Sequence, residues 1–438
     1  MTSERKMTRR SFLRNSAMGA TALSLGLRAS AEALGANDKI RLGFIGVANR
    51  GGQLLRSTLR LKDANVEVVA LCDVDEPTML KQEKATRLQC EKFTDFRKML
   101  EKKDMDAVVI ATPDHWHAIQ TIMACDAGKD VYVEKPLSIT VVEGRKMVEA
   151  VRRSNRVCQV GTQRRSSDLY QRLVEMVRGG KIGKVTVGRA YRLSNMYPTG
   201  IGIAPDAEPP DELDWEMWLG PRPERPFNVN IHPYKFRWWD LYSSQLGNWG
   251  VHYLDAMRWV VGEVAPSSVC SLGGKYAVKD ARTIPDTLEV TYELPSGMLM
   301  VFGQYQASGN PALAWGEVEL RGTQGTLNCS ENGFKIIPEK GGQFVESGLR
   351  MQPMEGKGPD GDSTDAHIRN FLDCMRSRKP CNADIEDGHR STTFSLLGNI
   401  SLATRSRIDW DWKRERITNN EEANNLLHYK YREPWKLT

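Results

Sequence analysis

The sequence predicts an α/β protein in two parts: an N-terminal Rossmann domain with a doubly wound parallel sheet, and a C-terminal α+β domain with a large, mostly antiparallel open sheet. Two observations carry this prediction. Short apolar, β-branched runs alternate with helical segments up to residue 160, and longer runs of alternating polarity follow Gly161. The chain of 438 residues is long enough for each part to bury its own core.

The first strand is expected at residues 40–46, where it runs into a Gly-rich turn that a helix over 52–61 follows. A second strand is expected at 66–72, ending at Asp73. The later strands of this part are expected at 107–110, 131–133 and 157–160. Because helical segments separate these runs, the strands should be parallel.

The second part begins with a helix over 169–178 and continues with longer strands. These strands are expected at 184–193, at 287–294 and 298–305 as a hairpin, and at 317–321 and 326–328 as another. Residues 203–239 are rich in Pro and Trp with little periodicity, which predicts a long ordered loop near the site. Helices over 363–378 and 386–406 close the fold.

The predicted domain boundaries divide the chain into three units. Residues 1–37 form a signal segment and linker, residues 38–162 form the dinucleotide-binding Rossmann domain, and residues 163–438 form the substrate and oligomerisation domain. The C-terminal helices of the last unit are expected to pack back on the first domain.

The N-terminus carries the three parts of a twin-arginine signal in order. Residues 7–13 read Met-Thr-Arg-Arg-Ser-Phe-Leu, residues 17–27 are mildly apolar, and residues 29–31 offer a small-x-small cleavage site. The alternative is a basic, frayed terminus. We expect recognition by the twin-arginine export machinery and a periplasmic location, with no membrane span in the mature form.

Composition excludes several classes of partner. The net charge of +6, with 40% hydrophobic and 26% charged residues, is ordinary for a globular protein and gives no reason to expect nucleic acid. The eight cysteines have no zinc-site spacing, so no metal is predicted. We interpret them mostly as buried thiols, with a Cys374–Cys381 disulfide left open.

The Gly-rich turn predicts a bed for a nucleotide pyrophosphate. It reads Gly46-Val-Ala48-Asn49-Arg50-Gly51, and Ala48 replaces the second glycine of the usual G-x-G-x-x-G. A purely structural turn stays an alternative. Asp73 lies about twenty residues further on, where a carboxylate accepts hydrogen bonds from ribose hydroxyls and repels a 2′-phosphate. We therefore predict NAD, and NADP stays open because Arg50 can pair with a phosphate.

Two further clusters are expected at the same edge of the sheet. The first, Thr112 to His117, follows the strand over 107–110, and its two histidines are too close in sequence to share a helix face as metal ligands. In the second, the tripeptide Glu134-Lys135-Pro136 follows the strand over 131–133. A lysine here is well placed to meet a ligand.

A third cluster lies on a predicted helix, where Asn248, His252 and Asp255 fall on one face at i, i+4 and i+7. A histidine there can take a proton from a substrate hydroxyl, with Lys135 holding or relaying it. The alternative for His252 is a packed core histidine.

At these positions the chain resembles the glucose-fructose oxidoreductase / inositol dehydrogenase (Gfo/Idh/MocA) family over nearly all of its length after the signal segment. The resemblance implies that Lys135 touches both the nicotinamide and the reacting hydroxyl, that Pro136 follows a cis peptide bond, and that His252 is catalytic. The family often has an aspartate where this chain has Asn248, which puts a charged relay in doubt. The resemblance also implies further site residues. Cofactor contacts are expected from Thr112, Pro113, His117, Glu134 and Gln163, and substrate contacts from Arg164 and Asp255.

The sequence therefore predicts an exported NAD(P)-dependent oxidoreductase that moves a hydride between a CH-OH carbon of a sugar, glycoside or polyol and a tightly bound nicotinamide. Tyr191, Trp238 and Trp239 are expected to offer aromatic faces to the sugar. The alternative is a glycoside-cleaving enzyme that oxidises, eliminates and re-reduces with a retained cofactor, although that branch of the family often lacks the lysine. A silent binding protein is a third hypothesis. Family members are often dimers or tetramers, so a homo-oligomer is expected.

Overall fold

The computed structural model describes residues 38–345, 347–359 and 363–437. The twin-arginine pattern at residues 7–13 lies outside the described residues. Over the described part of the chain, no helix has the length and apolar character needed to cross a membrane. All eight cysteines fall within it and are free thiols, including Cys374 and Cys381.

The N-terminal sheet has six parallel strands in the order β3-β2-β1-β4-β5-β6, the doubly wound arrangement that the sequence predicts. Its strands are β1 (Ile40–Ile45), β2 (Val66–Cys72), β3 (Glu91–Phe93), β4 (Ala107–Ile110), β5 (Asp130–Val133) and β6 (Cys158–Val160). The helices between them are α2 (Asn49–Arg60), α3 (Glu76–Thr86), α4 (Phe96–Leu100), α5 (His117–Asp126) and α6 (Val141–Arg153). The carboxyl ends of β1, β2, β4 and β5 therefore meet at one edge.

The second sheet is mostly antiparallel and runs in the order β15-β14-β13-β12-β7-β10-β9-β8-β16-β17, with β11 paired to β7. Its strands are β7 (Val185–Asn195), β8 (Ser268–Gly274), β9 (Thr287–Glu293), β10 (Leu299–Tyr305), β11 (Ala307–Ser308), β12 (Val318–Gly322), β13 (Gly325–Ser330), β14 (Gly333–Pro338), β15 (Met354–Lys357), β16 (Ile408–Asp411) and β17 (Arg416–Ile417). The predicted hairpins are the β9/β10 and β12/β13 pairs. These two sheets confirm the predicted fold class.

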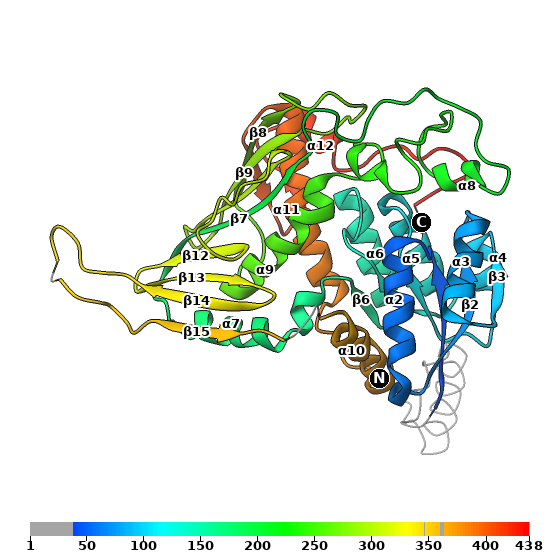
Figure 1. The fold of residues 1–438 in the computed structure, drawn as a ribbon, viewed down its shortest axis with the longest axis horizontal. Helices are drawn as coiled ribbons and strands as arrows, with labels where there is room; N and C mark the ends of the chain where they lie inside the picture. Colours follow the sequence, from blue (N-terminus) through cyan, green and yellow to red (C-terminus); the bar gives the residue numbers. More distant parts are fainter. Residues whose placement is uncertain (1–37, 346, 360–362, 438) are drawn as a thin grey trace, which may run out of the picture.

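The second sheet has one covered face and one open face. The covered face carries the core residues Leu320, Met300 and Tyr292, against which the helices pack. These helices are α7 (Asp168–Arg178), α9 (Val251–Val261) and α11 (Ile385–Thr404). Of these, α9 and α11 lie between the sheet and the Rossmann domain (Figure 1). Since side chains alternate along a strand, the neighbours of the core residues point to the open face.

Two helices of the C-terminal part tie the domains together. Ile368, Phe371 and Leu372 of α10 (Thr364–Ser377) share a core with Leu42 of β1. Helix α11 contacts both α6 of the first domain and α9 of the second. The two domains therefore present fixed surfaces to each other, which determines what can meet between them.

A long segment covers the carboxyl edge of the Rossmann sheet, where the sequence predicts an ordered loop. It contains the short helix α8 (Trp215–Leu219) and the 3-10 turn η4 (Lys235–Trp238). The segment is fastened to the first domain by an Asp75–Leu213 bridge and by the Asp214 amide, which donates to the Val74 carbonyl at 2.9 Å. From the C-terminal tail, Arg432 donates to the Gly220 carbonyl at 2.9 Å. The chain ends with helix α12 (Glu421–Asn425) and this tail.

Candidate active site

A cleft of about 790 Å³ lies between the carboxyl edge of the Rossmann sheet and the covering segment. Its floor includes seven of the residues that the sequence predicts as cofactor contacts. These are Gly46, Ala48, Asn49, Arg50, Asp73, Thr112 and Pro113. In such a sheet, a ligand usually binds at the carboxyl ends of the parallel strands.

The Gly-rich turn has no room for side chains at its two glycines. A Cβ on Gly51 would lie 1.9 Å from the Gly46 carbonyl oxygen, and a Cβ on Gly46, whose φ is +80°, would lie 2.7 Å from the Thr112 amide nitrogen. Ala48 has φ −68°, which any residue adopts, so its methyl group replaces a glycine without backbone strain. Within the described residues no side chain caps the start of α2, and its first turn holds no acidic residue. A helix start without a side-chain cap or an acidic residue, together with the helix dipole, suits a phosphate.

Asp73 ends β2 beside this turn and fits the role of ribose acceptor. Its carboxylate accepts from the Val47 amide at 2.8 Å and from the Asp75 amide at 3.1 Å. Burial raises the pKa of Asp73 to about 6, so the group is ionised at pH 7. Three features together fit a dinucleotide: glycines that leave no space for a Cβ, a helix start without a side-chain cap, and an acidic residue after the second strand.

Aromatic side chains form the opposite wall of the cleft. Trp218, His232 and Phe236 of the covering segment line it together with Phe96 and Trp116 of the Rossmann domain. Both His115 and Trp116 hydrogen-bond through their ring nitrogens to the Trp218 carbonyl, at 2.9 and 3.0 Å. The covering segment is thus held directly against the residues that follow β4.

Lys135 lies where the two domains meet. Its Nζ donates to the Asn248 carbonyl at 2.7 Å and to the Asn248 side-chain Oδ1 at 3.0 Å. Burial lowers the pKa of Lys135 to about 8, against the opposing effect of the Glu134 and Asp114 carboxylates. The Lys135–Pro136 peptide bond is cis. A half-buried lysine with a pKa of about 8 can take up or release a proton at a substrate.

Glu134 connects this lysine to the Gly-rich turn. Its carboxylate accepts from Arg50 Nε at 2.8 Å and from the Lys135 amide at 3.2 Å. Burial alone would raise the pKa of Glu134, but the Arg50 and Lys135 charges hold it below the usual value. Gly161 packs against this carboxylate. A Cβ on Gly161 would lie 2.6 Å from the Glu134 Oε1 atom. The sequence suggests that Arg50 can pair with a phosphate. In the structure, the Arg50 guanidinium is positioned by the Glu134 carboxylate.

His252 approaches the same junction from α9. Burial, together with the Lys135, Arg164 and Arg50 charges, places the pKa of His252 well below the ordinary value, so its ring is neutral at pH 7. The residues before it form a π-helical turn, η5 (Leu246–Gly250), which precedes α9 in place of the regular helix expected from the sequence. Such turns often occur at functional sites. Within the described residues no group of three or more His, Cys, Asp or Glu is arranged to hold a metal.

Comparison with known families now decides the class of the protein. The model of an oxidoreductase family with an NAD-binding Rossmann fold matches residues 40–162. The model of the same family's C-terminal α/β domain matches residues 171–312 and 354–437. The chain belongs to the Gfo/Idh/MocA oxidoreductase family.

Individual relatives match over part of their length. A glycosyl hydrolase family 109 protein of Shewanella sp. (strain W3-18-1) is 31% identical over 161 residues, 35% of this chain and 35% of that protein. An inositol 2-dehydrogenase of Salmonella paratyphi B is 28% identical over 185 residues, 41% of this chain and 54% of the relative. The chain thus spans between a third and about half of the length of these curated relatives.

Solved structures agree in fold over more of the chain. The WlbA dehydrogenase of Bordetella pertussis, solved with NADH and UDP-GlcNAcA, has a TM-score of 0.63 at 18% identity. The match covers 85% of this chain and 99% of that one. At this identity the likeness concerns the Gfo/Idh/MocA fold alone.

The structure places His117 away from the residues that line the cleft. The ring is buried, and its nitrogens lie 2.8 Å from the Pro136 carbonyl oxygen and 3.0 Å from the Thr112 carbonyl oxygen. His117 therefore joins the loops after β4 and β5 and does not face the cofactor cleft. Gln163 lies in the 3-10 turn η3 (Gln163–Ser166), and its Oε1 is buried with no hydrogen-bond partner among the described residues.

Asp255 and Arg164 are also placed differently from the prediction. The Asp255 carboxylate is buried against Arg165, at 2.8 Å, and accepts from Ser391 at 2.5 Å. The i, i+7 spacing places Asp255 on the face that packs inward. Arg164 is buried between the rings of Tyr170 and Tyr253 and pairs with Glu317 and Glu331. Both predicted substrate residues therefore make internal ion pairs.

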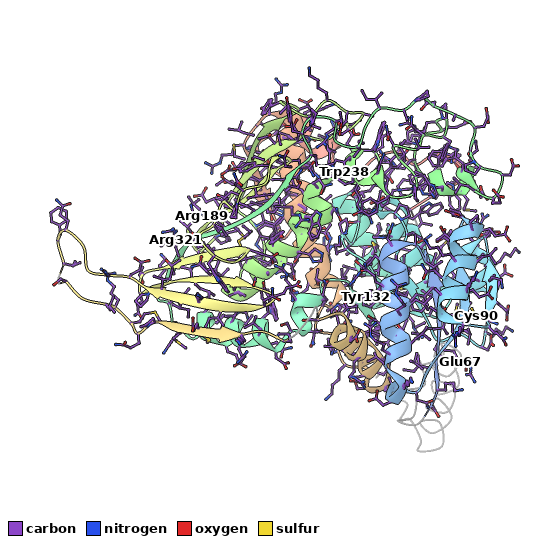
Figure 2. The ribbon with its side chains drawn as sticks, in the orientation of Figure 1. Glu67, Cys90, Tyr132, Arg189, Trp238 and Arg321 are labelled. Atoms are coloured by element: carbon purple, nitrogen blue, oxygen red, sulfur yellow. The ribbon has the colours of Figure 1, made fainter. Side chains whose placement is uncertain are left out.

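Of the three predicted aromatic contacts, Tyr191 lies on the wrong face of its sheet. Its strand neighbour Ala190 is in the core under α9, so Tyr191 points to the open face, where its ring lies 6.0 Å from that of Tyr305. Trp239 is a core residue whose Nε1 donates to the Asn230 carbonyl. Trp238, labelled in Figure 2, is half-buried and donates to Gln306 at 3.1 Å.

Two contacts near the junction were missed. Ser243 donates to Asp114, which places a buried carboxylate near Lys135. Arg192 lies over the Trp249 ring at 3.7 Å, and Trp249 in turn lies beside His252, with ring centroids 6.3 Å apart. Strand alternation would have selected Arg192 in place of Tyr191, had the covered face been known.

Proposed function

We propose that this family member transfers a hydride between a CH-OH carbon of a sugar, glycoside or polyol and the nicotinamide of NAD. The observation that carries the proposal is Lys135: a half-buried lysine with a lowered pKa, held by Asn248 beside a cleft that fits a dinucleotide. The names of the relatives support the substrate class, since they include an inositol 2-dehydrogenase and a dehydrogenase solved with NADH and a nucleotide sugar.

Proton transfer is assigned to Lys135 in preference to His252. When bound, the nicotinamide supplies the hydride acceptor. In the oxidative direction the substrate hydroxyl loses its proton to neutral Lys135, whose pKa of about 8 leaves part of the population ready to accept it at pH 7 to 8. His252, neutral at this pH because burial lowers its pKa, hydrogen-bonds the same hydroxyl and orients it.

Asn248 replaces a carboxylate with an amide at this junction. The amide oxygen accepts from Lys135 without adding a negative charge, so it holds the side chain in place while leaving its pKa lowered. A charged relay through residue 248 is therefore no part of the proposed mechanism. Asn248 acts as a positioning residue for Lys135.

We also propose NAD in preference to NADP, and a cofactor that dissociates slowly. Ionised Asp73 beside the turn disfavours a 2′-phosphate. Slow release is supported by the covering segment, which the Asp75–Leu213 bridge, the Trp218 carbonyl and Arg432 fasten across the cleft. Retained dinucleotide would suit a periplasmic enzyme, and we keep export by the twin-arginine route as a proposal based on residues 7–13.

The homo-oligomer expected from the sequence is proposed to form through the open face of the second sheet. Exposed apolar side chains on that face include Leu272, Leu299 and Ile337. Exposed apolar patches of this kind on a large sheet mark contacts between subunits.

Glycoside cleavage by transient oxidation is the second candidate. The relative named as a glycosyl hydrolase family 109 protein supports it, as does a fastened cofactor that recycles in place. Lys135 weighs against it, because the branch of the family with this chemistry often lacks the lysine.

The test is to incubate purified protein with NAD and a panel of sugars, polyols and aryl glycosides. Reduction of NAD, seen as nicotinamide absorbance, in step with loss of one sugar supports the proposal. Release of aglycone without reduced cofactor favours the second candidate. No turnover and no dinucleotide retained in the native mass spectrum would contradict both.

A further inference from the structure

Arg237 lines the dinucleotide cleft, and the reaction as proposed does not use it. The residue belongs to η4 of the covering segment, whereas the Gly-rich turn of the same cleft belongs to the Rossmann domain. A charged side chain that one domain extends toward the ligand of the other domain bears on how that ligand is held.

The charge of Arg237 is not balanced within the protein. Arg50, which lines the same cleft, pairs with Glu134 at 2.8 Å, but Arg237 has no ion pair among the described residues. Its Nη1 donates to the Tyr234 carbonyl at 3.0 Å, and its Nε and Nη2 donate to no residue that the structure describes. A half-buried guanidinium without a counter-charge, with two donors unused, is suited to an anion that a ligand supplies.

Aromatic rings hold the guanidinium in place without occupying these donors. The central carbon of the Arg237 guanidinium lies 4.3 Å from the ring centroid of Tyr234 and 4.4 Å from that of Phe236. Contacts of this kind attract a cation to the face of a ring. The side chain is therefore partly ordered before a ligand binds, which lowers the entropy cost of a new contact.

The turn that carries Arg237 is anchored to the second domain. Its neighbour Trp238, labelled in Figure 2, donates from Nε1 to the Gln306 side chain at 3.1 Å. The Thr283 amide donates to the Trp238 carbonyl at 3.0 Å. Arg237 thus reaches the cleft from the second domain, and a ligand that contacts both Arg237 and the Gly-rich turn is held by both domains.

The charges around Lys135 locate Arg237 along the cleft. Burial is the main cause of the lowered pKa of Lys135, and the Arg237 and Arg50 charges lower it further. Since Arg50 belongs to the Gly-rich turn, Arg237 lies at the end of the cleft where this turn approaches Lys135. At the ribose end, a different side chain of the covering segment is present: His232, whose Nε2 lies 3.6 Å from an Asp75 carboxylate oxygen.

We propose that Arg237 binds the pyrophosphate of the dinucleotide and holds it against the N-terminus of α2. Because NAD is itself a proposal, this contact rests on the proposed function and deepens it. The start of α2 suits one phosphate, since it has no side-chain cap and no acidic residue in its first turn. The planar fork of Arg237 offers Nε and Nη2 to two oxygens of the other phosphate.

The contact acts mainly on the release of the cofactor. A dinucleotide that leaves the Gly-rich turn must also break its bond to Arg237, which the second domain holds in place. Differences in affinity between variants of one site are found mostly in the dissociation rate. Arg237 therefore gives the proposed slow release of NAD a specific cause beyond the fastening of the covering segment.

The experiment measures the binding of NADH and of ADP-ribose to the wild type, Arg237→Gln and Arg237→Lys. Fluorescence titration gives the NADH Kd, competition gives the ADP-ribose Kd, and stopped-flow displacement gives the release rate. Arg237→Gln should weaken both ligands about 10- to 100-fold, mainly through faster release, because a hydrogen bond between charged groups is lost. ADP-ribose contains the pyrophosphate and lacks the nicotinamide, so an equal loss for both ligands assigns the contact to the part that they share.

Two further measurements separate this contact from a general effect of charge or of folding. Arg237→Lys keeps the charge without the fork and should recover part of the affinity. The control Arg414→Gln removes a charge whose side chain is 82% exposed and does not line the cleft, so the NADH Kd should stay within about twofold. Thermal unfolding without ligand should be unchanged in Arg237→Gln, since no ion pair within the described residues is lost.

An unchanged NADH Kd in Arg237→Gln overturns the contact. A loss confined to NADPH assigns Arg237 to a 2′-phosphate, and a raised KM for the sugar with an unchanged NADH Kd assigns it to the substrate. Either result also overturns it. If the wild type binds neither NADH nor ADP-ribose, the proposed function fails together with the contact. Binding of both ligands without an effect of Arg237→Gln refutes the contact alone.

Discussion

The dinucleotide cleft is shaped by backbone from a short stretch of chain, whereas the junction around Lys135 is shaped by side chains from both domains. In the cleft, Gly46 and Gly51 let two segments touch where a Cβ has no room. At the junction, Lys135 of the first domain depends on Asn248 of the second for its position, and on burial for its lowered pKa. A substitution within the Gly-rich turn is therefore enough to disrupt the cleft, whereas the junction around Lys135 can be disrupted by a substitution in either domain.

The largest expected effect is in the cleft, with Gly51→Ala. The new Cβ would lie 1.9 Å from the Gly46 carbonyl oxygen, so the turn must open. NADH binding should weaken by more than about 100-fold, the loss expected when a backbone contact to a phosphate is misplaced. Titration of NADH fluorescence measures it. The control Ala48→Gly, where φ is unstrained, should bind within a few-fold of wild type. Near-normal NADH binding by Gly51→Ala would contradict the claim that the backbone of the Gly-rich turn shapes the cleft.

Lys135→Met breaks the junction while sparing the cleft. Loss of the proton acceptor should lower kcat roughly 10²–10⁴-fold, the range for a removed acid-base group. NADH affinity should stay close to that of wild type. Steady-state kinetics and the same fluorescence titration separate the two effects. Lys146→Met, on the exposed side of α6, is the matched control. Equal losses of kcat and of NADH affinity would mean that Lys135 holds the cofactor more than it moves the proton.

The substitution Asp255→Asn tests whether Asp255 contacts the substrate at the junction or stabilises the fold through its ion pair with Arg165. Removing the charge leaves Arg165 and Arg258 buried and undercompensated, which should lower the free energy of unfolding by about 3–5 kcal/mol in urea. The half-exposed Asp387, which pairs with the same arginines, serves as control, and Asp387→Asn should cost less. A loss of activity without loss of stability would return Asp255 to the set of substrate residues.

The pH dependence of the same pair has a defined sign. Burial would raise the pKa of Asp255, but Arg165 outweighs burial and lowers it. A lowered folded pKa gives a stabilisation that is fully present above the ordinary carboxylate pKa and is lost as pH falls through the folded value. Asp255→Asn should therefore flatten the acid side of the stability curve, as measured by urea unfolding at several pH values.

Asn248→Asp gives the smallest and most diagnostic change. A carboxylate beside Lys135 favours its charged form, so the pKa of about 8 should rise, and the rising limb of kcat/KM in the oxidative direction should move by ~1 pH unit to higher pH. A pH-rate profile measures the shift. The control Asn399→Asp alters an amide bonded to Ser244 and should leave the profile in place. A profile that does not move would assign the limb to another group, such as His252.

Most of the fold could be read from the sequence because its signals are local. The β-α alternation up to residue 160 and the hairpin around residues 295–297 needed no knowledge of distant contacts. The Gly-rich turn could also be predicted, since Gly46 and Gly51 indicate a tight backbone conformation within one stretch of six residues. The family resemblance added the tripeptide with Lys135.

The predicted site residues that the structure places away from the cleft and the junction are those whose surroundings depend on how distant elements pack. Tyr191 and Arg192 are neighbours in β7, and only the packing of α9 decides that Arg192 faces the junction. Asp255 shares the predicted helix face with His252, yet Arg165 and Ser391, from other parts of the chain, decide its contacts. His117 was expected to touch cofactor, and the two loop carbonyls that enclose it come together only in the folded domain.

The sequence by itself determined the two sheets, the pyrophosphate turn, Asp73 and the placing of Lys135 at a strand end, because each depends on backbone conformation or on period within a few residues. Only the tertiary structure decided that Lys135 is held by Asn248 and that the covering segment is fastened over the cleft. These depend on burial and on charges brought together from distant parts of the chain, which no local pattern records.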